Sequence, residues 1–141
     1  MSKKENIRKF ILGQVEKHPS NIASLVAKEF GVSRQTAHAH LTKEVGNGRL
    51  IRIGRTRWVK YFLVGGEHIE FPLKIHPKLD EYRIWVQYIK PMTLRYPKNI
   101  QDICSYGFTE IINNAVFHSG GTSIRIAFNV VDNNITINVL D

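Results

Sequence analysis

The sequence predicts a mixed α+β chain whose two parts differ in charge. Apolar residues recur at intervals of three and four through most of the first half, which is typical of helices with one buried face. In residues 124–139, apolar and polar residues alternate on both sides of Asp132-Asn133-Asn134, which predicts a β-hairpin. Residues 1–65 carry thirteen Lys and Arg against four Glu, whereas the other 76 residues carry seven basic and eight acidic side chains. This asymmetry indicates two domains with different partners.

Three helices are expected before residue 50. The first ends near Pro19, because proline cannot continue a helix. Gly31 suits the left-handed position at the end of the second, and Ser33 caps the third, which ends at residues 46–48. Their apolar positions are Ile7, Phe10, Ile11, Val15, Ile22, Leu25, Val26, Phe30, Val32, Ala37, Leu41 and Val45.

The segment LIRIGRTRWVKYFL, residues 50–63, predicts a two-stranded wing. It is rich in β-branched and aromatic residues and is broken at Gly54-Arg55-Thr56. Long cationic side chains on such a wing reach phosphates or a minor groove. The cations of the wing are Arg52, Arg55, Arg57 and Lys60.

The start of the third helix presents polar side chains on its outward face. They are Ser33, Arg34, Gln35, Thr36 and His38, with Lys43 further along. Recognition helices reach base edges with their N-terminal residues, and arginine pairs with guanine as glutamine does with adenine. Arg34 and Gln35 are therefore the first candidates for base contacts. The alternative is a solvated polar helix face without a partner.

The string VAKEFGVSRQTAHAHL, followed by the wing, resembles the winged helix-turn-helix superfamily of bacterial regulators. The resemblance implies binding to double-stranded DNA in transcription regulation, and a homodimer that doubles the phosphate contacts. A winged helix also serves as a protein–protein module. The net charge of +9 over residues 1–65 favours DNA.

A domain boundary is expected in residues 66–77, which mix glycine and proline without a sustained period and are interpreted as a linker containing a short strand from His68 to Leu73. A helix follows and ends before Pro91. Its apolar positions are Leu79, Tyr82, Trp85, Val86 and Ile89.

The single cysteine, Cys104, excludes an internal disulfide. No apolar run approaches the ~20 residues that span a bilayer, so we expect a soluble, cytoplasmic protein without a membrane partner.

The helix expected over residues 100–118 contains FTEIINNAVFHS. Its expected buried stripe is Ile103, Gly107, Phe108, Ile111, Ala115 and Val116. Glu110 and Asn114 are four residues apart and project from one side of the helix. Such a pair shares a hydrated divalent cation, or the carboxylate orients a water while the amide oxygen holds the metal. The alternative is that both are ordinary polar residues of a half-exposed helix.

This helix, the hairpin and Asp141 resemble the beginning of the GHKL ATP-binding domain of histidine kinases, anti-sigma serine kinases, Hsp90-type chaperones and gyrase-type enzymes. In that family a Glu-x-x-x-Asn-Ala helix supplies the magnesium ligand, and an aspartate at the end of a strand accepts from the adenine amino group. The resemblance implies Glu110 as the catalytic base, Asn114 as the magnesium ligand, and Asn114 with Asp141 as ATP-binding residues. It covers residues 78–141 and stops before the glycine-rich boxes and the lid.

We therefore expect a winged helix-turn-helix over residues 1–65 and a truncated α/β sandwich of GHKL type over residues 78–141. The sequence as given should bind Mg-ATP weakly or not at all, whereas a longer product should bind ATP and magnesium. The leading hypothesis is a bacterial transcriptional regulator in which the ATP state biases DNA affinity. The alternatives are a GHKL-type serine kinase or anti-sigma-like regulator, with Glu110 as general base, and a non-catalytic adaptor with a degenerate ATP fold.

Overall fold

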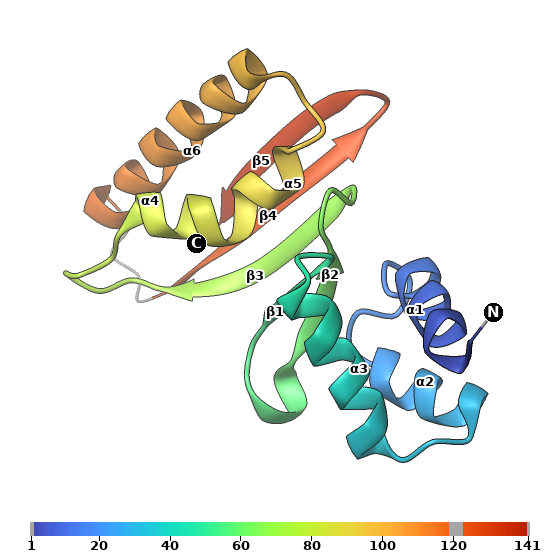
Figure 1. Ribbon diagram of the computed structural model, residues 1–141. Helices are drawn as coiled ribbons and strands as arrows, with labels where there is room; N and C mark the ends of the chain where they lie inside the picture. The colour runs from blue at the N-terminus through green and yellow to red at the C-terminus, as the bar shows by residue number, and fades with distance from the viewer. Residues whose placement is uncertain (1, 119–122, 141) are drawn as a thin grey trace. The chain divides into compact units, whose positions relative to one another are not determined.

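The computed structural model describes residues 2–118 and 123–140, and the chain divides into two compact units, Met1–Val64 and Gly65–Asp141 (Figure 1). Each unit combines helices with an antiparallel sheet. The mixed α+β class expected from the sequence is therefore confirmed. Among the described residues, no helix is both long and apolar enough to cross a membrane.

The first unit begins with three helices, α1 (Lys3–Gln14), α2 (Ile22–Phe30) and α3 (Arg34–Gly46). Local chemistry fixes their ends. Gly31 adopts φ of 62°, the left-handed conformation that ends α2 without a steric penalty. The Ser33 hydroxyl accepts a hydrogen bond from the backbone N–H of Thr36 at 3.1 Å and so caps α3.

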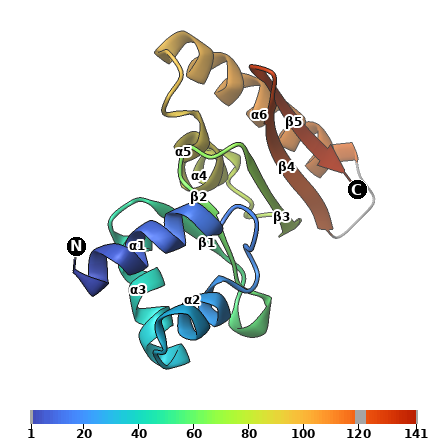
Figure 2. The same ribbon diagram turned by 90° about the vertical axis from the view of Figure 1, so that its right-hand side faces the viewer.

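The apolar faces of these helices meet in one core, around which Figure 2 shows the helices arranged. Ala37 and Leu41 of α3 are fully buried there, and the small side chain of Ala37 allows close approach of a neighbouring helix. The buried members are Ile7, Ile11, Val15, Ile22, Ala23, Val26, Ala37, Leu41, Leu50 and Tyr61. The helical periodicity of the sequence thus identified the buried faces of α1 to α3.

A hairpin completes the first unit. Strands β1 (Leu50–Ile53) and β2 (Lys60–Leu63) pair antiparallel, and the short 3₁₀ helix η1 (Thr56–Trp58) lies between them. The backbone N–H of Tyr61 donates to the carbonyl of Pro19 at 3.0 Å, which attaches β2 to the segment between α1 and α2. The hairpin is thereby anchored to the helices while its connecting turn projects away from the core.

The second unit contains an antiparallel sheet of β3 (His68–Lys74), β4 (Ser123–Val131) and β5 (Asn134–Leu140), with β4 in the middle. The short strand expected from His68 to Leu73 is present as β3, one residue longer, but the segment around it is part of the second unit and not a linker between two domains. Ile69 and Phe71 of this strand are buried. Their alternation with exposed and half-buried residues is the pattern of a strand with one buried face.

One face of this sheet carries the helices α4 (Glu81–Ile84), η2 (Trp85–Ile89) and α5 (Lys90–Thr93), together with α6 (Lys98–His118) (Figure 1). The rings of Tyr88 in η2 and Phe71 in β3 lie 4.8 Å apart between centroids. Those of Trp85 and Phe108 lie 5.9 Å apart. Aromatic packing thus joins the helical layer to the sheet and the helices to each other.

The helix expected to end before Pro91 instead continues to Thr93, so that expectation was wrong. The π-helical turn η2 widens the helix just before the proline, and Pro91 occupies the first turn of α5, where its missing N–H costs no hydrogen bond. Tyr82 and Val86, expected inside, are exposed, whereas Ile84 and Met92 are buried.

Helix α6 begins at Lys98, slightly earlier than expected, and its buried face is narrower than the sequence suggested. Phe108 and Ile112, one turn apart, are fully buried, but Ile103 and Ile111 are 66% and 37% exposed. The expected burial of these two isoleucines was therefore wrong. The described part of the chain covers only one side of α6, and the remaining apolar residues stay accessible.

Candidate functional site

Polar side chains are exposed at the N-terminal end of α3, namely Ser33, Arg34, Gln35, Thr36 and His38. The Ser33 hydroxyl donates to Thr36 Oγ1 at 3.0 Å while it caps the helix, so Ser33 and Thr36 are engaged with each other. Arg34, Gln35 and His38 are exposed and form no hydrogen bond or ion pair with any residue that the structure describes. These three are therefore available for an external ligand, whereas Ser33 and Thr36 mainly stabilise the start of the helix.

A buried carboxylate connects α3 to its neighbours. Glu44 is 3% exposed and accepts from Arg8 Nε of α1 at 3.3 Å and from Arg49 Nη1, just before β1, at 3.0 Å. The sequence analysis missed this cluster. Its signal is that Glu44 follows the buried Ala37 and Leu41 at helical spacing, so it occupies a core-facing position. Arg8 and Arg49 consequently serve the fold and are not part of the candidate interface.

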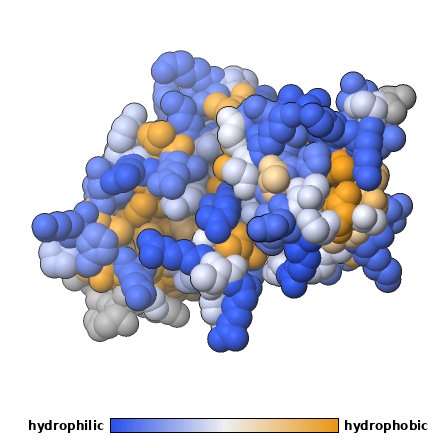
Figure 3. All heavy atoms as spheres, turned by 60° about the horizontal axis from the view of Figure 1, so that its bottom comes forward, coloured by the Kyte–Doolittle hydropathy of each residue, from blue (hydrophilic) through white to orange (hydrophobic). Residues whose placement is uncertain are grey.

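The hairpin carries the remaining candidate cations. They are Arg52 on β1, Arg55 and Arg57 in the connecting turn, and Lys60 on β2, all of them exposed. Lys43, in the last turn of α3, is exposed as well. Hydrophilic side chains project from much of the face drawn in Figure 3, between smaller apolar patches. The first unit thus presents exposed cations from two of its elements, the third helix and the hairpin.

The turn of the hairpin also exposes an aromatic residue that the sequence analysis did not select. Trp58 is 73% exposed, and the guanidinium of Arg57 lies 5.4 Å from the centroid of its ring. The signal was present as a tryptophan between charged residues in the predicted turn. Sequence alone did not reveal whether this side chain packs on the core or faces solvent.

In the second unit, Glu110 and Asn114 lie one turn apart on α6, as expected from their spacing. Both are exposed, and neither forms a hydrogen bond or ion pair within the described residues. Across residues 2–118 and 123–140, no group of three His, Cys, Asp or Glu is placed to hold a metal ion. Asp141, the expected adenine-binding residue, lies outside the described residues.

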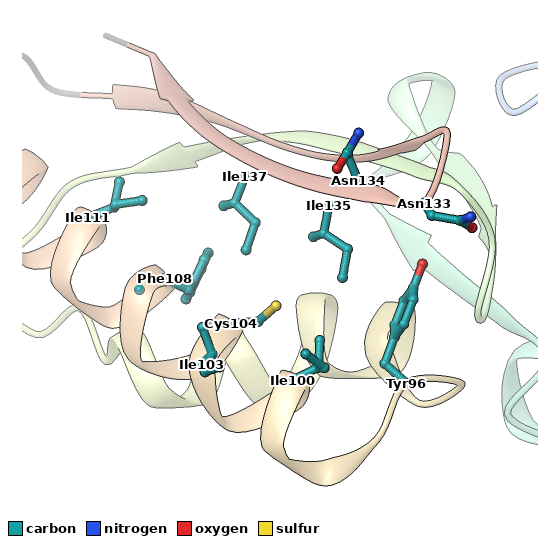
Figure 4. A pocket seen from close by; sticks show the side chains of 11 residues that line it. Tyr96, Ile100, Ile103, Cys104, Phe108, Ile111, Asn133, Asn134, Ile135 and Ile137 are labelled. Carbon is teal, nitrogen blue, oxygen red and sulfur yellow. The ribbon is translucent and has the colours of Figure 1, made fainter.

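An apolar groove of about 470 Å³ runs between α6 and β5. Figure 4 shows Ile135 and Ile137 of β5 pointing toward α6, with Cys104 and Phe108 of α6 facing them. The groove is further lined by Tyr96, Ile100, Ile103, Gly107, Ile111, Asn133 and Asn134. Glu110 and Asn114 are not among the residues that line it. The structure therefore separates the expected metal-binding pair from the apolar groove on the same helix.

The thiol in this groove is not an activated nucleophile. Burial raises the pKa of Cys104 above its ordinary value, because desolvation disfavours the thiolate. The thiolate is the reactive form of cysteine, and Cys104 has less of it at neutral pH than a free thiol has. Its contribution to the groove is therefore that of a small apolar side chain.

The face of the sheet away from α6 carries a polar cluster between β3 and β4. Arg125 of β4 donates to the carboxylate of Glu70 on β3. His68 Nδ1 lies 2.5 Å from Asn129 Oδ1, and these two residues are directly opposite each other in the strand register. Such cross-strand pairs stabilise strand pairing, which is a structural role.

Comparison with known proteins assigns no family, because no family model, no curated protein and no solved structure matches this chain. A functional assignment therefore depends on the residues described above.

Proposed function

We propose that the first unit is a winged helix-turn-helix that binds double-stranded DNA, and that the chain is a bacterial transcriptional regulator. Helix α3 is the recognition helix and the β1–β2 hairpin is the wing. The proposal depends mainly on two groups of exposed side chains in the same unit. Arg34, Gln35 and His38 at the start of α3 form no hydrogen bond or ion pair with the described residues, and the hairpin carries exposed cations.

The connection between α2 and α3 supports this proposal. Residues 31–33 join the two helices through the left-handed Gly31, and the cap at Ser33 starts α3 at once. A short turn containing glycine is typical of helix-turn-helix units, whose second helix enters the major groove with its N-terminal residues. In this chain those residues are Arg34, Gln35 and His38, whose donors and acceptors suit base edges.

The charge of the unit supports it further. Phosphate contacts provide most of the sequence-independent affinity of DNA-binding proteins, and arginine and lysine provide those contacts. The buried Glu44 neutralises only cations near the core, so the cations of the wing keep their charge for a polyanion. A protein–protein role for the unit leaves this excess of exposed cations without a function.

A pair of double variants tests the proposal. Arg55→Ala with Arg57→Ala should weaken binding of the full chain to any duplex by about tenfold or more, because two phosphate contacts are lost. Lys74→Ala with Lys78→Ala removes the same charge from exposed positions in the second unit and should change affinity by less than about twofold. Equal losses for both pairs, or no binding by the unaltered chain at low salt, would contradict the proposal.

For the second unit we propose a GHKL-type ATP-binding module, with Asn114 as magnesium ligand and Glu110 as general base. Its support is an antiparallel sheet with helices on one face, on which one helix carries Glu110 and Asn114 as exposed neighbours. In this arrangement the ATP state biases DNA affinity only if ATP binds two conformations unequally. A GHKL-type serine kinase is the enzymatic alternative, and a non-catalytic adaptor is the alternative without ATP.

Calorimetry tests this second proposal in a product that carries a Gly-x-Gly segment after Asp141. Asn114→Ala should remove magnesium-dependent ATP affinity, whereas Glu110→Ala should spare binding and abolish any slow hydrolysis. Asn138→Ala, another exposed amide in the same unit, is the matched control and should leave binding unchanged. Tight Mg-ATP binding that survives Asn114→Ala would contradict the GHKL assignment.

A further inference from the structure

Trp58 in the turn of the hairpin is exposed, although tryptophan side chains in folded proteins are usually largely buried. It is 73% exposed, and the other large hydrophobic side chains found exposed in the described residues all belong to the second unit. Among the described residues of the first unit, the other large apolar side chains are buried or partly buried, and Trp58 lies in the turn of the hairpin among its cations. Tryptophan provides a large, rigid contact surface, which makes it a frequent anchor at binding sites.

The backbone of the turn holds Trp58 outward. Gly54 has φ of 91°, and a Cβ added there would lie 2.4 Å from the carbonyl oxygen of Trp58, so the chain closes tightly on itself. The N–H of Trp58 donates to the carbonyl of Arg55 at 3.1 Å. Thr56 has φ of 52°, a strained conformation for a β-branched residue. Strain retained in a short, closed turn often marks a functional position.

The charge around the indole selects the kind of ligand. The guanidinium of Arg57 is stacked over the ring at 5.4 Å, and the high exposure of Trp58 leaves ring surface open to a second planar group. Exposed Arg55 and Lys60 provide cations on the same hairpin. An aromatic face beside cations is the combination that binds a nucleobase together with its flanking phosphates. An acidic peptide would satisfy the cations but would leave the indole face unused.

We infer that Trp58 stacks on an unpaired nucleobase, so that the chain prefers a duplex with an extrahelical base over a fully paired duplex. In a fully paired duplex the bases are already stacked on their neighbours, and access to a base face requires unstacking. A bulged base offers its face at a much smaller cost. This inference rests on the proposed DNA binding of the first unit and adds a ligand class that the helix and wing cations do not imply.

Tryptophan fluorescence tests this inference directly. The sequence contains two tryptophans, and Trp85→Phe leaves Trp58 as the only reporter. A fully paired duplex and the same duplex with one extra unpaired base are titrated at equal salt. The bulged duplex should quench Trp58 strongly and bind at least about fivefold more tightly, because base–aromatic stacking is worth about that factor or more. Trp58→Ala should remove the difference, and Trp58→Phe should keep part of it.

The outcomes are distinguishable. If neither duplex binds, the proposed DNA function fails, and this inference fails with it. If both duplexes bind equally to the unaltered chain, or if Trp58→Ala weakens both by the same factor, DNA binding stands and the preference for an unpaired base is overturned. Equal quenching by poly-glutamate would also overturn it. If Trp85→Phe does not fold, the difference in fluorescence between the unaltered chain and Trp58→Phe gives the same signal.

Discussion

Single residues divide the positive charge of the first unit into two kinds. Arg8 and Arg49 bind the buried carboxylate of Glu44, whereas Arg34 and the wing arginines face solvent. A buried carboxylate is costly unless it is paired and hydrogen-bonded, so its two arginines are structural requirements. The charge that matters for a polyanionic partner is therefore that of the exposed group.

Glu44→Ala should destabilise the chain by ~1–3 kcal/mol, because it removes the shared partner of two arginines and leaves a cavity. This loss of stability should be smaller than for a fully buried ion pair, because Arg8 and Arg49 are partly exposed and water can solvate them once Glu44 is removed. Urea unfolding measures it. Glu29→Ala, an exposed glutamate of α2, is the control and should cost less than ~0.5 kcal/mol. Equal midpoints for the two variants would show that the buried cluster contributes nothing.

Arg34→Ala and Gln35→Ala should change which DNA sequence is preferred, because each removes a side chain suited to a base edge. The expected loss is ~1–3 kcal/mol on the preferred site and little on unrelated DNA. Selection of bound sequences from a random pool, followed by affinity measurements, checks this. Arg55→Ala with Arg57→Ala should weaken all sequences alike. If the wing pair alters preference and the helix pair does not, the roles of the two elements are reversed.

Elements whose ends are set by residues close to them in the sequence could be predicted. Gly31 and Ser33 fixed the boundaries of α2 and α3, and alternation identified β4 and β5. The π-helical turn before Pro91 was not predictable, because a proline locally signals the end of a helix. The π-helical turn places Pro91 in the first turn of α5, and the helical segment therefore continues past it.

The turn of the hairpin depends on one glycine. Gly54→Ala should destabilise the chain by ~1–3 kcal/mol, since a methyl group at this left-handed position meets the backbone of Trp58. Gly46→Ala is the matched control, because a Cβ there meets nothing within 4 Å and φ is not positive, so stability should be unchanged or slightly raised. Thermal unfolding compares the two variants. A Gly54→Ala variant as stable as Gly46→Ala would mean that the turn is not closed as described.

Across the whole molecule, the division at residue 65 coincides with the change in charge, so each unit has its own core and its own surface chemistry. The sequence supplied the candidate interface of the first unit, because charge and helix ends are local properties. The groove between α6 and β5 could not be predicted from the sequence. Ile103 and Ile111 have the spacing of core residues, and only the folded structure shows that no described element covers them. Exposure of an apolar stripe is a property of the assembled unit.

The measurement that tests the central claim most directly is the salt dependence of duplex binding by the full chain. Neutralising several phosphates releases counterions, so the logarithm of the binding constant should fall linearly with the logarithm of salt concentration, with a slope steeper than about −3. Arg55→Ala with Arg57→Ala should make that slope shallower by about 2, and Lys74→Ala with Lys78→Ala should leave it unchanged. A flat salt response, or a slope that the wing pair does not alter, would contradict the account.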